Sequence, residues 1–208
     1  MKKVIMEFIG TFFLVLTIGL TALSPEVGLF APLTIGAVLI VMVYTGGPIS
    51  GAHYNPAVTL AIYLSKKCTL KEVPYYIIAQ LMGAILATYI VLFLTGTTES
   101  VVTLTFLPAF ISEVLFTFAL VFVILNVGFS NRSKGNAYYG IAIGLTVVAG
   151  IYAVGDISGG VFNPAVAISL IGMGITDLST LGLYVGSQFI ASVVAWKVFQ
   201  IIEMKEAS

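Results

Sequence analysis

The tripeptide Asn-Pro-Ala occurs twice in this sequence and has the clearest chemical meaning of any motif in it. The two copies are Asn55-Pro56-Ala57 and Asn163-Pro164-Ala165. Because Asn is a favoured N-cap and Pro a favoured first helical residue, each copy predicts the start of a short helix. The first turn of a helix carries unpaired N–H groups and about half a positive charge. Two such ends facing each other would repel cations and protons while offering hydrogen bonds to a neutral solute.

The composition places these two helix starts in a membrane. Hydrophobic residues make up 59% of the 208 residues and charged residues only 9%, with a mean hydropathy of +1.11. Soluble domains are about 25% charged. The zero net charge gives no indication of a nucleic-acid partner. Cys68 is the only cysteine and no Cys/His cluster has metal-ligand spacing, so the sequence predicts no disulfide, metal or cofactor.

Apolar segments between polar breaks predict six membrane spans, since a span needs about 20 apolar residues. They are 4–23, 33–48, 73–94, 109–128, 138–154 and 180–201. Two further apolar segments, 55–64 and 163–172, are too short to cross and are expected to be half-helices. Lys2 and Lys3 before the first span have the pattern of a signal peptide, but Glu7 interrupts the apolar run and its motif recurs in mid-chain. We therefore expect a retained span.

The charges support this layout. With a cytoplasmic amino terminus, every Lys and Arg falls on the cytoplasmic side or at its membrane edge, while several acidic residues fall on the other side, as the positive-inside rule requires. The basic residues are Lys2, Lys3, Lys66, Lys67, Lys71, Arg132, Lys134, Lys197 and Lys205, and the acidic ones are Glu26, Glu99, Asp156 and Asp177. The sequence thus predicts a multi-pass protein of the cell membrane with both termini in the cytoplasm.

The chain also contains an internal repeat. Glu7-x-x-x-Thr-Phe recurs 106 positions later from Glu113, and the Asn-Pro-Ala copies and the pair Gln80 and Gln188 are 108 positions apart. Each half holds three spans, an odd number, so the halves must cross the membrane in opposite directions. We expect one channel domain, 1–208, of inverted repeats at about 1–105 and 106–208. Such repeats place their site near the bilayer midplane.

The segments before the two tripeptides are expected to supply acceptors to that site. Irregular backbone at this depth is tolerated where it borders a watery cavity, so carbonyl groups of 50–54 and 158–162 would line the path. Each Asn would cap its own helix while its amide NH2 faces the lumen as a donor. Small residues at Gly83, in Gly140-x-x-x-Gly144 and in Gly182-x-x-x-Gly186 are expected to allow close helix approach.

These motifs together resemble the aquaporin (major intrinsic protein) family along nearly the whole chain. The resemblance rests on both Asn-Pro-Ala boxes, Ser50-Gly51-Ala52-His53, the two Glu-x-x-x-Thr-Phe motifs and Gly140-x-x-x-Gly144. It implies an all-α membrane fold: a right-handed bundle of six transmembrane helices plus two half-helices in two inverted repeats. It further implies a homotetramer in the lipid bilayer, with a separate pore in each subunit.

The resemblance also locates an outer constriction. Counting from the boxes, the matching positions are Ile35, Ile151, Gly160 and Val166. Most relatives carry Arg where this chain has Val166, and glycerol-type relatives carry Arg-Asp where it has Val166-Ala167. The box fixes Val166 directly, whereas Ile35 and Ile151 depend on counting through a span. Such a ring is apolar, so water would lose hydrogen bonds there and weakly hydrated neutral solutes would lose fewer.

Three titratable residues within the apolar segments need an explanation. Glu7 and Glu113 would serve either a proton relay or, as the resemblance implies, a structural brace that accepts backbone hydrogen bonds of the pore loops. His53, the only histidine, would either line or gate the channel with pH or be a hydrogen-bonded loop residue.

The sequence therefore predicts a passive channel for water or small uncharged solutes that excludes ions. The alternative is a facilitator of glycerol, ammonia, hydrogen peroxide or gases with poor water flow. An inverted-repeat secondary transporter is disfavoured because the spans hold no acidic residue beyond Glu7 and Glu113 for a coupling ion. An enzyme is disfavoured because His53 has no carboxylate near it in sequence and no nucleophile motif occurs.

Overall fold

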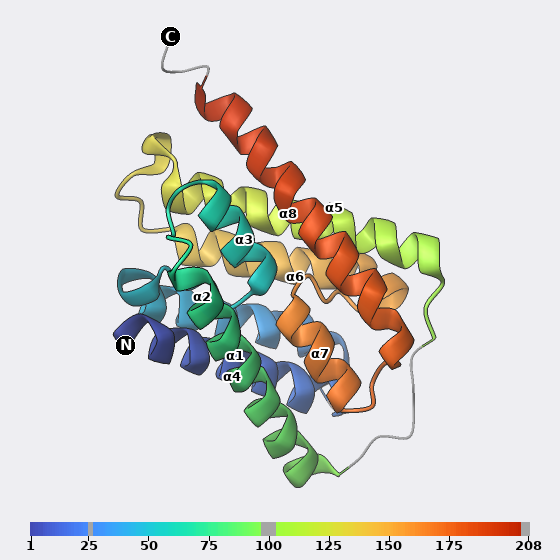
Figure 1. Ribbon diagram of the computed structural model, residues 1–208. Coiled ribbons are helices and arrows are strands. Elements are labelled where there is room, and N and C mark those ends of the chain that lie inside the picture. Colours follow the sequence, from blue (N-terminus) through green and yellow to red (C-terminus); the bar gives the residue numbers. More distant parts are fainter. Residues whose placement is uncertain (25–26, 97–102, 205–208) are drawn as a thin grey trace.

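A computed structural model of the protein describes residues 1–24, 27–96 and 103–204, and every regular element in these ranges is a helix (Figure 1). The long helices are α1 (Lys2–Ala22), α2 (Ala31–Ser50), α4 (Glu72–Thr95), α5 (Phe106–Phe129), α6 (Tyr139–Ser158) and α8 (Leu181–Met204). The short ones are α3 (Pro56–Leu64) and α7 (Pro164–Gly172), with single turns η1 (Gly28–Phe30), η2 (Asn131–Ser133) and η3 (Leu178–Thr180). Of the predicted charges, Glu26, Glu99 and Lys205 lie outside the described residues.

The predicted all-α fold of six spans and two half-helices is confirmed. Six described helices are long and apolar enough to cross a membrane, and each matches a predicted span with ends that differ by a few residues. The largest difference is in α6, which continues beyond 154 to Ser158. Asp156 therefore lies in its last turn, where it is exposed. Ser50 and Ser158 end helices instead of beginning the irregular segments, which are 51–54 and 159–162.

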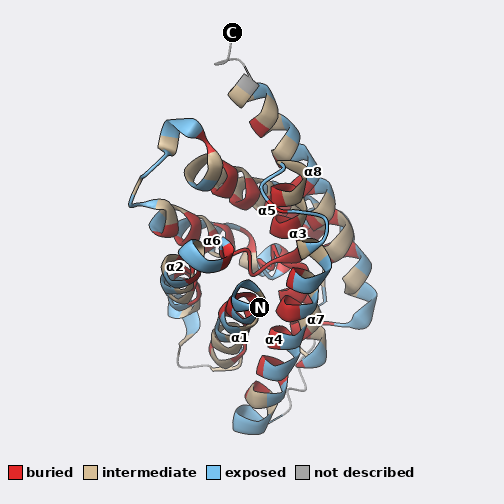
Figure 2. Ribbon diagram, turned by 60° about the vertical axis from the view of Figure 1, so that its left-hand side comes forward, coloured by how far each residue is buried: buried red, intermediate tan, exposed pale blue. Residues whose placement is uncertain are grey.

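The helices pack as two similar groups. In the first, α1 contacts α2 and α4, and in the second, α5 contacts α6 and α8, while contact between α2 and α6 joins the groups. The half-helices α3 and α7 lie end to end between them, with their N-termini at the centre (Figure 1). Buried residues face this centre and exposed ones lie on the outer faces (Figure 2). A lipid-facing exterior of apolar side chains explains why so many large hydrophobic residues are exposed.

Small residues bring the helices into backbone contact at two of the predicted places. A Cβ atom added to Gly83 would lie 2.5 Å from the carbonyl oxygen of Phe8, and one added to Gly144 would lie 2.7 Å from that of Gly36. The prediction that Gly182 and Gly186 allow close approach of another helix of this chain is wrong. A Cβ atom added to either glycine would meet nothing within 4 Å.

Candidate functional site

The two loops that precede the Asn-Pro-Ala boxes have the same unusual backbone. Three residues in each have positive φ angles near the left-handed region. These are Gly51 (90°), Ala52 (51°) and Tyr54 (49°) in the first loop, and Gly159 (86°), Gly160 (63°) and Phe162 (49°) in the second. This conformation is costly for residues with a Cβ atom, so tertiary contacts must maintain it.

Each Asn caps its own half-helix. The side-chain oxygen of Asn55 accepts a hydrogen bond from the Ala57 N–H (2.8 Å), and that of Asn163 accepts one from the Ala165 N–H (3.0 Å). Pro56 and Pro164 occupy the first helical positions, where a missing N–H costs nothing. The capping chemistry that the sequence suggests is thus present in both half-helices.

The amide groups of the same residues join the two half-helices. Asn55 Nδ2 donates to the Phe162 carbonyl oxygen at 2.8 Å, and Asn163 Nδ2 donates to that of Tyr54 at 2.9 Å. The sequence predicted that the NH2 group of each amide faces the lumen. The structure differs, because each amide uses one N–H elsewhere. One N–H of each binds the opposite loop, and the second leaves each Asn one further donor.

Glu7 binds the first loop through four donors. Its Oε1 accepts from the Ser50 hydroxyl (2.6 Å) and the His53 N–H (3.0 Å), and its Oε2 accepts from the Tyr54 N–H (2.7 Å) and Gln80 Nε2 (2.8 Å). The side chain is fully buried. Since all four partners donate, the acceptor-only carboxylate form fits the site.

Glu113 repeats this arrangement in the second loop. Its Oε1 accepts from the Ser158 hydroxyl (2.8 Å) and the Val161 N–H (2.9 Å), and its Oε2 accepts from the Phe162 N–H (2.8 Å) and Gln188 Nε2 (2.9 Å). The two carboxylates thus satisfy N–H groups that a membrane interior could not otherwise solvate. These contacts hold the left-handed loop backbones in place.

Both loops and both Asn residues border one narrow cavity. Its volume is about 50 Å³, enough for roughly three to five water molecules at about 10–15 Å³ each. The lining includes Asn55 and Asn163, His53, and all four residues predicted for the constriction: Ile35, Ile151, Gly160 and Val166. Most other lining residues are aliphatic, and among the described residues none is charged. Pro56, Ala57, Pro164 and Ala165 are buried in the half-helices.

Gly160 and Ile151 are adjacent in this wall. A Cβ atom at Gly160 would lie 3.1 Å from the Ile151 Cα atom, so a larger residue would press on α6. The close approach therefore brings the backbone of the second loop to the cavity beside an aliphatic side chain.

His53 lies in the cavity wall and is also hydrogen-bonded. Its Nδ1 is 3.2 Å from the Thr59 hydroxyl oxygen, which donates its proton to the Asn55 carbonyl (2.9 Å) and accepts from Gln80 Nε2 (3.0 Å). The threonine proton is used, so Nδ1 of His53 must be the donor, and we infer the Nδ1–H tautomer. Its Nε2 is then an acceptor, near Gly51. Both interpretations of this histidine made from the sequence are thus compatible with its position.

Sequence reasoning missed two tyrosines, one for each loop, that hydrogen-bond to the residue just before the loop. Tyr76 donates to the Ser50 carbonyl oxygen at 2.8 Å, and Tyr184 donates to that of Ser158 at 2.7 Å. Their separation by 108 positions, the offset of the Asn-Pro-Ala boxes, is the signal that could have found them.

Cys68 is buried and does not line the cavity. Burial raises the pKa of its thiol to about 11, which keeps the thiol protonated and poorly reactive.

Six apolar helices around two half-helices that meet N-terminus to N-terminus define a class of inverted-repeat membrane proteins. Comparison with known proteins identifies the family within that class. The family model "Major intrinsic protein" matches residues 1–137 and 100–208, which together span the chain. The protein belongs to this family, the aquaporins, as the sequence motifs predict.

Individual relatives agree with this assignment. Aquaporin AqpM of Methanothermobacter thermautotrophicus is 32% identical over 233 residues, covering 96% of this chain and 89% of the relative. Nodulin-26 of Glycine max is 38% identical over 177 residues, covering 79% of this chain. The chain spans about two thirds of the length of the first plant relatives, 65% of Nodulin-26 and 66% of a probable NIP-type aquaporin of Nicotiana alata. The solved structure of an aquaglyceroporin from Plasmodium falciparum superposes with a TM-score of 0.81 at 25% identity, covering 95% of this chain and 94% of that one.

Proposed function

We propose that the protein is a passive channel for water and small uncharged solutes. The observation that carries the proposal is the pair of Asn side chains that link two opposed helix N-termini at the wall of one narrow cavity. Both helix dipoles direct their positive ends to this point, which disfavours cations and protons. Neutral molecules meet amide donors and carbonyl acceptors there instead.

We further propose that Ile35, Ile151, Gly160 and Val166 form the outer constriction. All four border the cavity and none offers a charged donor. Water entering such a ring loses hydrogen bonds that an Arg would replace. This favours the second candidate, a facilitator of weakly hydrated neutral solutes such as glycerol, ammonia, hydrogen peroxide or gases, with modest water flow.

Glu7 and Glu113 are proposed as braces of the pore loops and not as a proton relay. Each carboxylate already accepts four hydrogen bonds, so neither offers a further site to a travelling proton or a coupling ion. Because a secondary transporter needs a site for its coupling ion, the full hydrogen bonding of both carboxylates also argues against that function. A non-enzymatic role fits the resemblance to channel proteins.

The remaining sequence predictions are part of this proposal. They are one channel domain of repeats at about 1–105 and 106–208, both termini in the cytoplasm of a cell membrane, and a homotetramer. The positions of α1 to α4 before residue 96 and of α5 to α8 after residue 105 support the division. Basic residues on the turns after α3 and α5, Lys66, Lys67, Arg132 and Lys134, support the orientation.

The test is light scattering of reconstituted vesicles in a panel of osmolytes, with Val166→Arg beside the wild type. We expect modest wild-type water flow and better relative flow of glycerol. The added guanidinium supplies donors for water and narrows the opening, so the ratio of water to glycerol permeability should rise by roughly tenfold, since a hydrogen bond to a charged group contributes about 1.5–3 kcal/mol. Wild-type water flow equal to that of a strict water channel, with no change in the variant, would contradict the apolar constriction. A wild-type proton leak would show that the helix dipoles alone are an insufficient barrier.

A further inference from the structure

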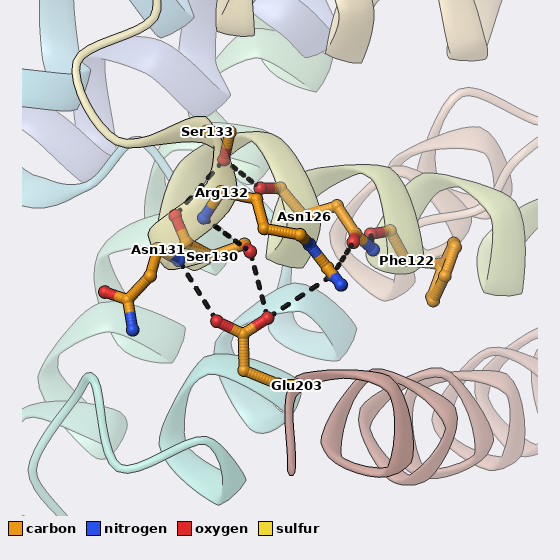
Figure 3. A network of polar contacts seen from close by, with 7 residues as sticks. All are labelled: Phe122, Asn126, Ser130, Asn131, Arg132, Ser133 and Glu203. Carbon is orange, nitrogen blue, oxygen red and sulfur yellow. Dashed lines mark hydrogen bonds and ion pairs between the residues drawn. The ribbon is translucent and has the colours of Figure 1, made fainter. Parts of the chain in front are cut away.

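The segment between α5 and α6 carries a polar network that the proposed channel does not use. Residues 130–136 include η2 and fold back onto the end of α5 (Figure 3). The Ser133 hydroxyl donates to the Asn126 carbonyl, and Asn136 Nδ2 donates to the Val127 carbonyl at 2.7 Å. These contacts attach the segment to the helix that precedes it in sequence.

A single carboxylate attaches the same segment to the other end of the chain. Glu203, near the end of α8, accepts from the Ser130 hydroxyl at 2.9 Å and from the Asn131 N–H at 3.1 Å. Arg132 Nη2 lies 3.3 Å from the same carboxylate (Figure 3). Ser130 is buried, and the Glu203 side chain is only 25% exposed. One side chain thus fixes three consecutive residues of the segment.

The segment also forms one wall of a wide cavity. This vestibule has a volume of about 550 Å³ and is bordered by Ser130, Asn131 and 133–136, with Gly51, Ala52 and Lys67 among its other lining residues. It shares Val43, Ala52, Ile124 and Ile143 with the narrow cavity between the Asn residues. The vestibule therefore opens into the candidate pore. Glu203 does not line it, so the carboxylate holds Ser130 and Asn131 from outside the cavity wall.

We propose that Glu203 is a positioning residue for this mouth of the channel, an inference that rests on the proposed function. Its carboxylate holds segment 130–136 against the ends of α5 and α8 and so keeps the vestibule open. Without it, the segment loses its hydrogen bonds to α8, and those of its residues that border the vestibule can move into the space in front of Ala52. The mouth then restricts every solute equally, because it lies outside the narrow region that selects among solutes.

The first readout is permeability. Water and glycerol flow per channel are measured by light scattering in vesicles containing wild type, Glu203→Ala or Glu203→Gln. We expect both permeabilities to fall together by roughly twofold or more in Glu203→Ala, with their ratio unchanged. The reason is that segment 130–136 detaches from α8 and narrows the vestibule. Glu203→Gln keeps one acceptor and should show a smaller fall. The matched control is Glu72→Ala, which removes the other salt bridge among the described residues, Glu72 with Lys3 at 2.7 Å, from a surface apart from the vestibule.

The second readout follows the segment itself. Trypsin cleavage after Arg132 and Lys134 is timed by mass spectrometry on the purified variants in detergent. Loss of two hydrogen bonds and an ion pair should speed cleavage in Glu203→Ala by about tenfold, and Glu72→Ala should cleave at the wild-type rate.

The two readouts separate the possible results. Faster cleavage with unchanged flow, unchanged cleavage, or a changed water-to-glycerol ratio would each overturn the role of Glu203 while leaving the proposed channel intact. A wild-type protein that conducts neither solute would overturn the proposed function and this role with it.

Discussion

The two loops that end at Asn55 and Asn163 share a framework but differ in chemistry. Their left-handed residues, carboxylate cradles and cross-linking amides correspond position by position. The polar network beside the first loop does not recur: His53 corresponds to Val161, and Thr59 to Ala167. The contacts that both loops share therefore hold the loop backbones in place. The pair His53 and Thr59, which the second loop lacks, gives one half of the cavity an additional hydrogen-bonding residue.

The cavity wall extends the same comparison. The residues proposed for the outer constriction have counterparts 108 positions away that also border the cavity: Ile143 for Ile35, Val43 for Ile151, Ala52 for Gly160 and Val58 for Val166. An aliphatic wall is thus common to both halves. Within the described lining, two corresponding pairs differ in polarity: His53 with Val161, and Tyr54 with Phe162. The Tyr54 hydroxyl already donates to the Met42 carbonyl at 2.9 Å, so we infer that His53 is the main source of the polarity difference between the two halves of the cavity wall.

The largest expected effect tests what the loops share. In Glu7→Gln or Glu113→Gln an NH2 group replaces an acceptor and faces donors at close range. Leaving buried donors unpaired costs about 1–3 kcal/mol each, so each variant should lose several kcal/mol of stability and unfold at a clearly lower temperature in detergent. The two losses should be similar, because both sites have four donors. Glu72→Gln, at a partly exposed ion pair, is the control and should change stability by less than about 1 kcal/mol. Tolerance of one substitution but not the other would break the equivalence of the loops.

A smaller effect tests how they differ. His53→Val and Thr59→Ala introduce the residues at the corresponding positions of the second half. His53→Val should cost about 1 kcal/mol through one lost hydrogen bond, and Thr59→Ala about 2 kcal/mol or more because it leaves two buried donors unpaired. Thr59→Ala alone leaves the His53 and Gln80 donors unpaired, whereas the double variant leaves only Gln80. The two costs should therefore couple by roughly 0.5 kcal/mol or more in a double-mutant cycle of thermal unfolding. Strict additivity would show that the two side chains act independently.

The smallest effect concerns the turn after each half-helix. Lys66 and Gly174 are corresponding positions with φ angles of 59° and 75°. Because a Cβ atom costs about 1 kcal/mol in this region, Gly174→Ala should destabilise the protein by about that amount, and Lys66→Gly should stabilise it by a few tenths to about 1 kcal/mol. Thermal unfolding of both variants checks this. A stabilising Gly174→Ala would mean that the two turns are not equivalent.

Much of the fold was accessible from the sequence because its signals are local. Apolar length predicts the spans, and Asn55 and Asn163 predict the half-helix starts, since capping depends on neighbouring residues. The predicted span 138–154 ends before α6 does, because Gly155 and Asp156 interrupt the apolar run, whereas the helix continues to Ser158. The partners of Glu7 and Glu113 could be anticipated only as loop N–H groups, because the sequence does not specify which donors reach a carboxylate more than 40 positions away.

The sequence by itself determined the class of the protein: composition requires a membrane, the repeat requires inversion, and the two boxes require opposed helix starts. Only the tertiary structure decided that each Asn amide binds the opposite loop, that His53 lies within hydrogen-bond distance of Thr59, and that Glu203 accepts a hydrogen bond from Ser130. The physical reason is the same in each case. A hydrogen bond depends on the position and direction of two groups to within fractions of an ångström, and for residues far apart in the chain those positions are set by how whole helices pack.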